Sequence, residues 1–176
     1  NMVAEIAVRQ NHPVEIVKIL HDNGNDLNFD CHNDEGKIVK LIHLAIIQEN
    51  VEMVRKLLDL GANVNLMIDG RESLIIFAAK HKRTEVCFEL IKRGASAGLA
   101  LYLQGSISCN KVDWLIYILR TSPVDLKNSN FANGLNIFTY SVSVDRPQIL
   151  EALFSELGFY IFKADAQGNT ILTTPV

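Results

Sequence analysis

The fold of this chain is decided by residues 51–65, which read VEMVRKLLDLGANVN. Apolar residues recur there at the three- and four-residue spacing of a helix that buries one face, and Gly61 follows where helices commonly end on a left-handed residue. The same pattern returns without a gap at residues 14–28, which is 37 positions earlier, and at residues 84–95, which is 33 positions later. Self-similarity at such a period indicates a repeat protein.

A shorter apolar block precedes two of these stretches. It reads LIHLA at residues 41–45 and LIIFA at residues 74–78, again 33 positions apart. Both blocks have helical spacing, and the second block of each unit is the longer one. Each unit is therefore predicted to be a helix, a turn, a second helix and an extended loop.

These motifs resemble ankyrin repeats: IHLA at residues 42–45, the stretch at 51–65, and DAQGNT at 165–170. The resemblance covers nearly the whole chain and implies an all-α ankyrin-repeat solenoid. We expect one domain, 1–176, with units at approximately 1–33, 34–66, 67–97, 98–128, 129–163 and an incomplete 164–176. Neither end supplies the polar cap that a solenoid needs, so we expect a fragment of a longer protein.

Three departures from a regular repeat give local predictions. The fourth unit follows the third by only 28 positions, and residues 96–100 replace the usual turn, so a stunted or helical connection is predicted there instead of a hairpin finger. The loop at 29–40 is about two residues longer than expected, which predicts a finger that protrudes further. Pro147 suits the first turn of a helix and is predicted to begin the second helix of the fifth unit.

Composition limits the possible functions. Hydrophobic residues make up 48% of the 176 residues and charged residues 21%, which predicts a folded protein. A net charge of -3 argues against nucleic acid as a partner. No apolar stretch approaches the roughly 20 residues that span a bilayer. Cys31, Cys87 and Cys109 lack C-x-x-C spacing and are interpreted as reduced thiols, which favours a cytoplasmic location.

A metal site is not expected. Only Cys31 and His32 lie close together, in a predicted loop, and adjacent residues rarely converge on one ion. His43 occupies the place of the histidine in the family's T-P-L-H motif, where the resemblance implies a structural hydrogen bond between neighbouring loops. We therefore predict neither a metal nor a cofactor.

The sequence also gives no sign of catalysis. It has no G-x-S-x-G nucleophile motif and no glycine-rich phosphate loop. Cys87 falls on the buried face of a predicted helix, and Cys109 lies at a helix turn where it could be exposed. The basic run at residues 80–83 falls at a turn between helices and is interpreted as a solvated turn. We expect a protein that is not an enzyme.

The resemblance implies where a partner would bind: on the ends of the first helices, called the palm, and on the loops, called the fingers. The palm positions are Arg9, Gln10, Ile47, Gln48, Lys80, His81, Ser108, Cys109, Ser143 and Val144. The finger positions are Asn33, Asp34, Glu35, Lys37, Asp69, Arg71, Asn133, Leu135 and Gln167. An exposed Ile47 or Val144 would be an apolar anchor.

Two further readings stay open beside the main hypothesis. The main hypothesis is a monomeric scaffold that binds another protein or a peptide in the concave groove, where rigid stacking reduces the entropy lost on binding. The chain could instead be the targeting or regulatory module of a larger enzyme whose catalytic domain lies elsewhere. It could also belong to a bacterial effector that acts in a host cytosol.

Overall fold

The computed structural model describes residues 2–123, 130–157 and 164–170. The chain folds into two compact units, Asn1–Ala97 and Gly98–Val176. The predicted all-α repeat architecture is confirmed, with short hairpins as the only strands among the described residues. The finer division into six repeats stays a prediction.

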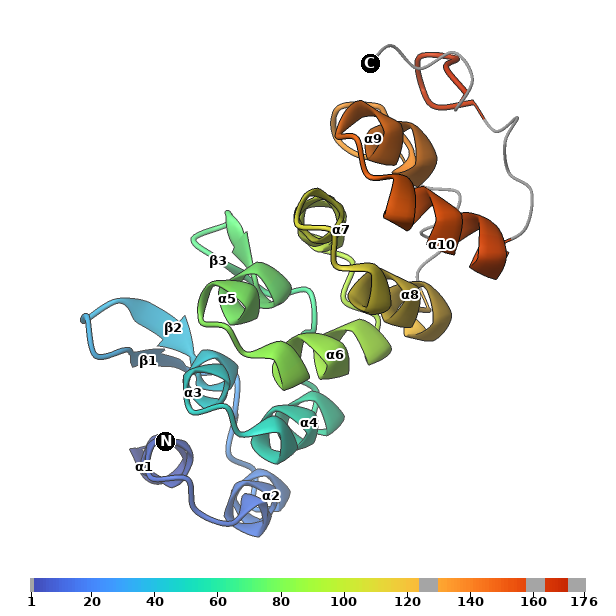
Figure 1. Cartoon of the computed structure of the whole chain (residues 1–176). Coiled ribbons are helices and arrows are strands. Elements are labelled where there is room, and N and C mark those ends of the chain that lie inside the picture. Colours follow the sequence, from blue (N-terminus) through green and yellow to red (C-terminus); the bar gives the residue numbers. More distant parts are fainter. Residues whose placement is uncertain (1, 124–129, 158–163, 171–176) are drawn as a thin grey trace. The chain divides into compact units, whose positions relative to one another are not determined.

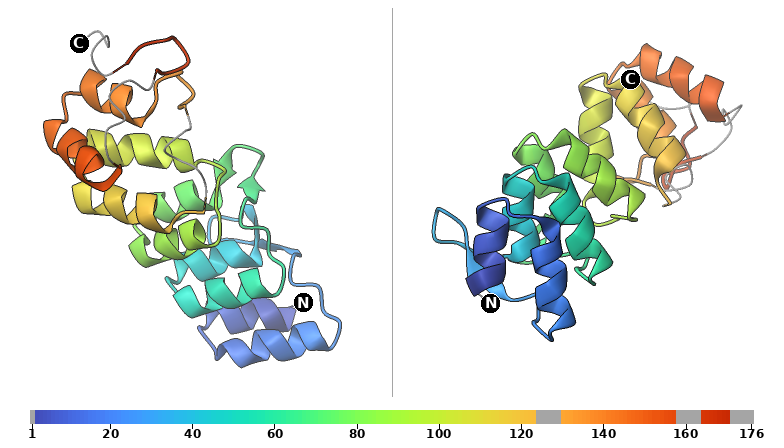
Figure 2. Two further views of the ribbon diagram at one scale, coloured as in Figure 1. Left: turned by 90° about the vertical axis from the view of Figure 1, so that its right-hand side faces the viewer. Right: turned by 90° about the horizontal axis from the view of Figure 1, so that it is seen from below.

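Helix pairs build the first unit. The inner helices are α1 (Met2–Arg9), α3 (Leu41–Ile47) and α5 (Leu74–Lys80). The outer helices are α2 (Val14–Asp22), α4 (Val51–Asp59) and α6 (Thr84–Lys92). The inner helices form one row, α1 on α3 on α5, and the outer helices form a second row beside it (Figures 1 and 2). The unit is therefore a two-layered stack of helix pairs.

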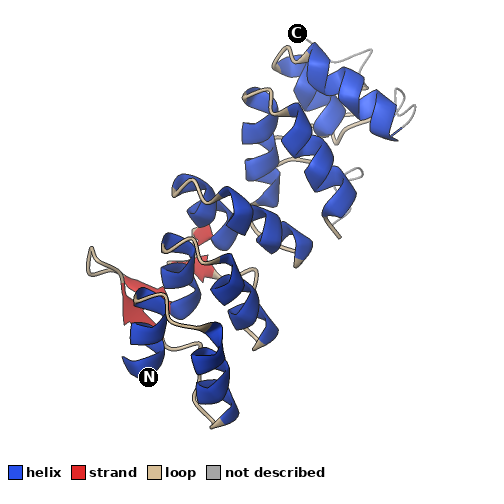
Figure 3. Ribbon diagram, turned by 60° about the horizontal axis from the view of Figure 1, so that its bottom comes forward, coloured by secondary structure: helices blue, strands red, loops and turns tan. Residues whose placement is uncertain are grey.

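Two hairpins extend from the inner helices of the first unit (Figure 3). Finger 1 consists of β1 (Asp30–His32) and β2 (Ile38–Lys40), with Cys31 opposite Val39. Finger 2 consists of β3 (Met67–Ile68) and β4 (Glu72–Ser73), with Met67 opposite Ser73. The strands of finger 1 have three residues and those of finger 2 have two, so the prediction of a longer first finger is confirmed.

The turn between the two helices of each pair has the same backbone conformation in every repeat. One non-glycine residue there has a φ between 51° and 59°. These residues are Asn11, Glu49, Lys82, Asn110 and Asp145. Left-handed residues also end the outer helices of the first unit, at Gly24, Gly61 and Gly94. These glycines follow the longer helical blocks identified in the sequence, at positions where a glycine reaches positive φ without steric cost.

The core of the first unit lies between the two helix rows. The residues of α3 from Leu41 to Ile46 are all buried, and Leu74, Ile75 and Ala78 of α5 are inaccessible to solvent. Each buried large aliphatic side chain stabilises a fold by roughly 1.5–3 kcal/mol. Cys87 is 1% exposed, as predicted for a core position. The inner helices α3 and α5 therefore supply a large part of the apolar core of this unit.

An ionic network ties the outer helices α4 and α6 together. The buried carboxylate of Glu89 accepts from Arg55 (3.2 Å) and Arg93 (3.0 Å), and Arg93 also pairs with Asp59 (2.5 Å). Burial alone would raise the pKa of Glu89, but the hydrogen bonds from the two arginines outweigh it and lower that pKa. Glu89 is therefore held ionised between neighbouring repeats.

The second unit also consists of helix pairs. Its helices are α7 (Leu99–Ser108), α8 (Val112–Thr121), α9 (Ile137–Ser143) and α10 (Pro147–Leu157). A short turn, with Gly98 in the left-handed conformation, leads directly into α7, so the prediction of a stunted or helical connection in place of a finger is confirmed. Pro147 begins α10, also as predicted. Residues 164–170 form a turn in which Asp165 accepts from the backbone N–H groups of Gln167 and Asn169.

Cys31 and His32 lie in strand β1, within the finger predicted at residues 29–40. One prediction about local structure is wrong. His43 does not connect neighbouring loops: its Nδ1 accepts from the backbone N–H of Lys40 (3.1 Å), at the base of its own finger. Its Nε2 has no hydrogen-bond partner among the described residues, and its ring centroid lies 5.1 Å from that of Phe77 in the next repeat, with the two ring planes nearly perpendicular.

His43 is buried as a neutral imidazole. Burial lowers its pKa from the usual 6.5 to about 4, against the raising effects of the Lys40 backbone and of Glu72. Between these two pH values the unfolded chain binds a proton at this position and the folded chain does not, so the free energy of unfolding falls as the pH falls. The contribution amounts to roughly 3 kcal/mol at most.

The variant His43→Thr tests this pH dependence. Thr139 occupies the equivalent place in α9 and accepts from the backbone N–H of Asn136, so threonine preserves the local bond without titrating. We expect the wild type to lose stability more steeply than the variant between pH 6.5 and 4, as measured by urea unfolding. Parallel pH profiles of the two proteins would contradict the buried neutral state.

Candidate functional site

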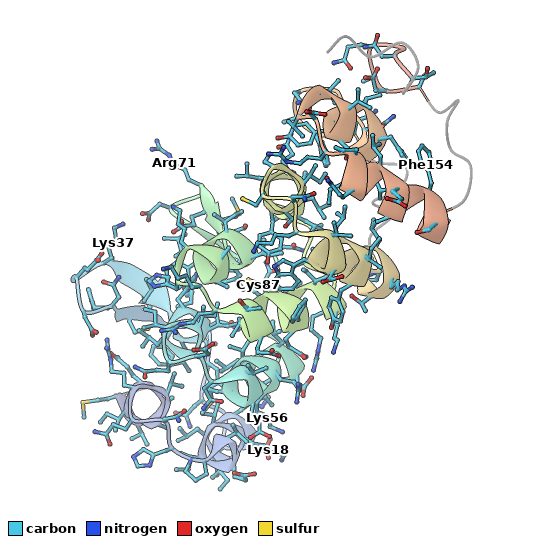
Figure 4. All side chains as sticks on the ribbon, viewed as in Figure 1. Lys18, Lys37, Lys56, Arg71, Cys87 and Phe154 are labelled. Atoms are coloured by element: carbon cyan, nitrogen blue, oxygen red, sulfur yellow. The ribbon has the colours of Figure 1, made fainter. Side chains whose placement is uncertain are left out.

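The two fingers and the ends of the inner helices form one surface on the first unit. Lys37 projects from finger 1 and Arg71 from finger 2, whereas Lys18 and Lys56 lie on the outer helices (Figure 4). The finger residues and the outer-helix residues therefore mark two different faces of this unit.

The tip of finger 1 is held by its own hydrogen bonds. The Asn33 side chain accepts from the backbone N–H groups of Glu35 (3.1 Å) and Lys37 (2.8 Å). The Asn33 N–H donates to the Lys37 carbonyl (2.9 Å), and Gly36, with a φ of 75°, closes the turn. Such an Asx turn fixes the backbone from which Glu35 and Lys37 project.

Arg9 ties finger 1 to the first inner helix. Its guanidinium pairs with Glu5 on α1 (2.9 Å) and with Asp34 on the finger (3.0 Å), and it donates to the carbonyl of His32. At the other end of the finger, the Lys40 ammonium pairs with Asp30 at 2.7 Å. Two predicted binding residues, Arg9 and Asp34, thus hold the finger in place.

Finger 2 and the end of α5 present the next group of predicted residues. Asp69 and Arg71 are exposed at the turn of the finger. Lys80, the last residue of α5, reaches back to pair with Glu72 of β4. The exposed ring of His81 lies 4.5 Å from the ring of Phe77. Finger and palm are therefore linked within this repeat by an ion pair.

A pocket of about 130 Å³ lies between finger 1, finger 2 and α5, and we call it the finger-palm pocket. Its floor consists of Val39, Ile68 and Phe77. Its rim consists of Asn33, Glu35, Lys37, Glu72, Lys80 and His81. A shallower pocket of about 330 Å³ adjoins the finger-palm pocket. Both pockets are lined by Lys37, Ile68, Glu72 and Lys80, and the shallower one is also lined by Asp69 and Arg71. The structure thus brings seven of the predicted residues around two connected hollows.

The palm positions near the ends of α1 and α3 differ in exposure. Gln10 and Gln48 are exposed, whereas Ile47 is half-buried. The Ile47 carbonyl accepts from Arg83 (2.8 Å), which also pairs with Glu49 at 2.9 Å. The basic run at 80–83 is therefore more than a solvated turn, because its last residue joins two repeats.

The predicted residues of the second unit are described by themselves. The Ser108 carbonyl accepts twice from Arg146, at 3.0 and 2.8 Å, and its hydroxyl lies 3.0 Å from that of Tyr140. Cys109 is exposed at the end of α7, as expected, and Ser143 is exposed. Val144 is half-buried.

The loop before α9 carries the remaining predicted residues. Asn133 is exposed, its carbonyl accepts from Gln167, and its side chain accepts from the N–H of Leu135 at 3.2 Å. Leu135 itself is half-buried. Gln167 therefore joins the turn at 165–170 to this loop.

Several residues that hold or line these sites in the two units were not predicted from the sequence. Arg83 and Arg146 each precede an outer helix and donate to the last turn of the neighbouring inner helix, where a cation is favoured. Their matching place before the second helix of two repeats is a signal that could have identified them. Glu72 in β4 and Phe77 in α5 were missed as pocket residues, because the sequence does not show which strand and helix positions face a pocket.

Other kinds of site are not found in the described part of the chain. No group of three or more His, Cys, Asp or Glu side chains is placed there to hold a metal ion. Burial raises the pKa of Cys31 to about 11, so this thiol is protonated at neutral pH. Among the described helices, none has both the length and the apolarity needed to cross a bilayer.

A family model described as ankyrin repeats (three copies) matches residues 4–100. The chain belongs to the ankyrin repeat family. Ankyrin repeats are protein-interaction modules. The match includes both fingers, all inner helices of the first unit and the finger-palm pocket.

Solved structures show the same fold across this ankyrin repeat chain. One is the predatory endopeptidase Bd0816 from Bdellovibrio bacteriovorus in complex with immunity protein Bd3460 (22% identity, TM-score 0.57, 98% of this chain and 89% of the matched chain). The ankyrin repeat protein EF0377 is 18% identical, with a TM-score of 0.61, and the match covers 98% of this chain and 89% of the EF0377 chain. The human ASB11 ankyrin repeat domain is 15% identical, with a TM-score of 0.50, and the match covers 98% of this chain and 91% of the ASB11 chain. No curated protein matches the sequence.

The role of Arg9 predicts a measurable change in finger 1. In Arg9→Ala we expect the amides of the Asn33 turn to exchange with deuterium a few-fold to about tenfold faster, because a partly exposed ion pair and a charged hydrogen bond are lost. Lys18→Ala, which removes an exposed ion pair on α2, is the matched control and should leave finger exchange unchanged. Equal exchange in all three proteins would show that Arg9 does not hold the finger.

Proposed function

We propose that this ankyrin repeat chain is an interaction module that binds a partner protein or peptide on the fingers and palm of its first unit. The predicted contacts in this unit are Arg9, Gln10, Asn33, Asp34, Glu35, Lys37, Ile47, Gln48, Asp69, Arg71, Lys80 and His81. The role is one of binding without catalysis, and the module acts as a monomer.

The observation that supports the proposal most is the fixed geometry of the fingers. Finger 1 is held by Arg9 at one side and by the Lys40–Asp30 pair at the other, and its tip is closed by Asn33. Finger 2 is held to the palm by the pair between Lys80 and Glu72. Because these side chains and loops are already ordered, little entropy is lost when a partner binds.

The chemistry of the surface also favours a protein over a nucleic acid. Lysine and arginine side chains alternate there with Glu35, Asp69 and Glu72, so no continuous basic stripe faces the solvent. Phosphate backbones require clustered cations, whereas mixed charges around an apolar hollow suit a polypeptide.

The second unit contributes proposed contacts of its own. They are Ser108, Cys109, Asn133, Leu135, Ser143 and Val144. The exposed Cys109, Ser143 and Asn133 are accessible to a partner. The half-buried Leu135 and Val144 would contribute apolar contact, which makes them weaker anchors than fully exposed side chains would be.

Site-specific photo-crosslinking tests the proposal. Benzoylphenylalanine replaces Lys37, Arg71 or Lys80 on the finger and palm surface, and Lys18 or Lys56 on the outer helices as matched controls. After irradiation in a lysate we expect the same protein band from the first three positions and none from the controls, since the face that carries Lys18 and Lys56 is not the binding face. Cross-links confined to the control positions would overturn the proposed surface.

A further inference from the structure

We propose that the finger-palm pocket receives one aliphatic side chain of an extended partner segment, and that the adjoining pocket receives the carboxylate of a neighbouring acidic residue. This inference rests on the proposed binding function and names the chemistry of the bound segment. It assigns the recognition to residues of two consecutive repeats.

The floor of the finger-palm pocket is apolar and built from separate elements. Val39 comes from finger 1, Ile68 from finger 2 and Phe77 from α5. A cavity of roughly 150 Å³ with aliphatic and aromatic walls holds one benzene molecule. The pocket of about 130 Å³ therefore has room for one side chain of that size class.

The walls of the pocket are fixed before anything binds. The Phe77 ring is held between His43, at 5.1 Å with perpendicular planes, and His81, at 4.5 Å. Val39 is 4% exposed and its carbonyl accepts from the thiol of Cys31 at 3.3 Å. A rigid apolar hollow with a polar rim is the environment in which a single inserted side chain contributes most to affinity.

The charges around the adjoining pocket leave one cation in excess. Its lining contains Lys37, Arg71 and Lys80 against Asp69 and Glu72. The Lys80 ammonium pairs with Glu72, whereas Lys37 and Arg71 make no salt bridge within the described part of the chain. A carboxylate placed beside Lys37 and Arg71 would neutralise the excess positive charge of the pocket. Arginine favours carboxylates because its planar guanidinium can bind both oxygens.

The two pockets meet at Ile68 and Lys37, which line both. An extended chain advances by about 3.3 Å per residue, so an aliphatic and an acidic residue one or two positions apart can enter both hollows. A helical segment would bring the same pair together only at a spacing of three or four residues. The spacing of the aliphatic and acidic residues in selected peptides therefore distinguishes the proposed extended segment from a helical one.

Selection of displayed random linear peptides on the wild-type chain tests the inference. Enriched peptides are synthesised with a fluorescent label, and their affinity is measured by anisotropy for the wild type and for variants. Ile68→Asp places a charge in the pocket floor, and Lys37→Glu reverses the finger cation. The matched controls are Ile19→Asp, whose isoleucine is 59% exposed on α2, and Lys18→Glu on the same helix.

The expected peptides carry an aliphatic residue with an acidic residue one or two positions away. We expect Ile68→Asp to weaken their binding about tenfold or more, since a carboxylate in an apolar hollow opposes insertion. Lys37→Glu should weaken it several-fold, with a smaller loss at high salt. Both controls should stay within about twofold of the wild type. Thermal unfolding followed by circular dichroism confirms that each variant folds.

Three outcomes overturn the inference: no enrichment of any peptide, peptides that lack an acidic residue, or peptides that bind Ile68→Asp as well as the wild type. If cross-links still form at Lys37, Arg71 and Lys80 in any of these cases, the proposed function stands and only the pocket chemistry is wrong. If the cross-links are confined to Lys18 and Lys56, the proposed function fails as well.

Discussion

The first unit depends on the burial of helix α3 between α1 and α5. The residues of α3 from Leu41 to Ile46 are all buried, and its two neighbours pack on opposite sides of it. Strand β2 ends at Lys40, directly before α3, and β4 ends at Ser73, directly before α5. Because each finger runs without a break into an inner helix, the stacking of the helices also sets the positions of the fingers.

This constraint explains why the finger-palm pocket exists at all. Its floor and rim come from finger 1, finger 2 and α5, which no single repeat contains. Ionic contacts also hold these elements in position. Arg9 holds finger 1 to α1, and Arg83 joins the end of α3 to the next repeat. The exposed pairs contribute modestly to stability, so their main effect is on the precision of the surface and not on the free energy of unfolding.

The repeat register could be predicted from the sequence because it depends on local signals. Helical spacing in the two blocks, the glycines after the outer helices and Pro147 each act within a few residues, and all agree with the structure. The longer finger 1 and the helical start of α7 followed from counting residues between repeats.

The candidate site was predicted only in part, because pockets depend on contacts between residues far apart in the sequence. The predicted finger and palm positions fall on the elements that line the pockets, but the Lys80–Glu72 pair and the shared floor of Val39 and Phe77 require coordinates. The hydrogen bond expected of His43 failed for the same reason: its neighbour in the next repeat is Phe77, which cannot accept as a carbonyl does.

In the proposal made here, the stacked inner helices of the first unit present the fingers and palm as one binding surface. Amide chemical-shift mapping of the nitrogen-15-labelled wild-type chain, before and after adding a selected peptide, tests it most directly. We expect the largest changes in finger 1, in finger 2 and at the end of α5, and unchanged amides in α2 and α4. Changes concentrated on those outer helices would contradict it.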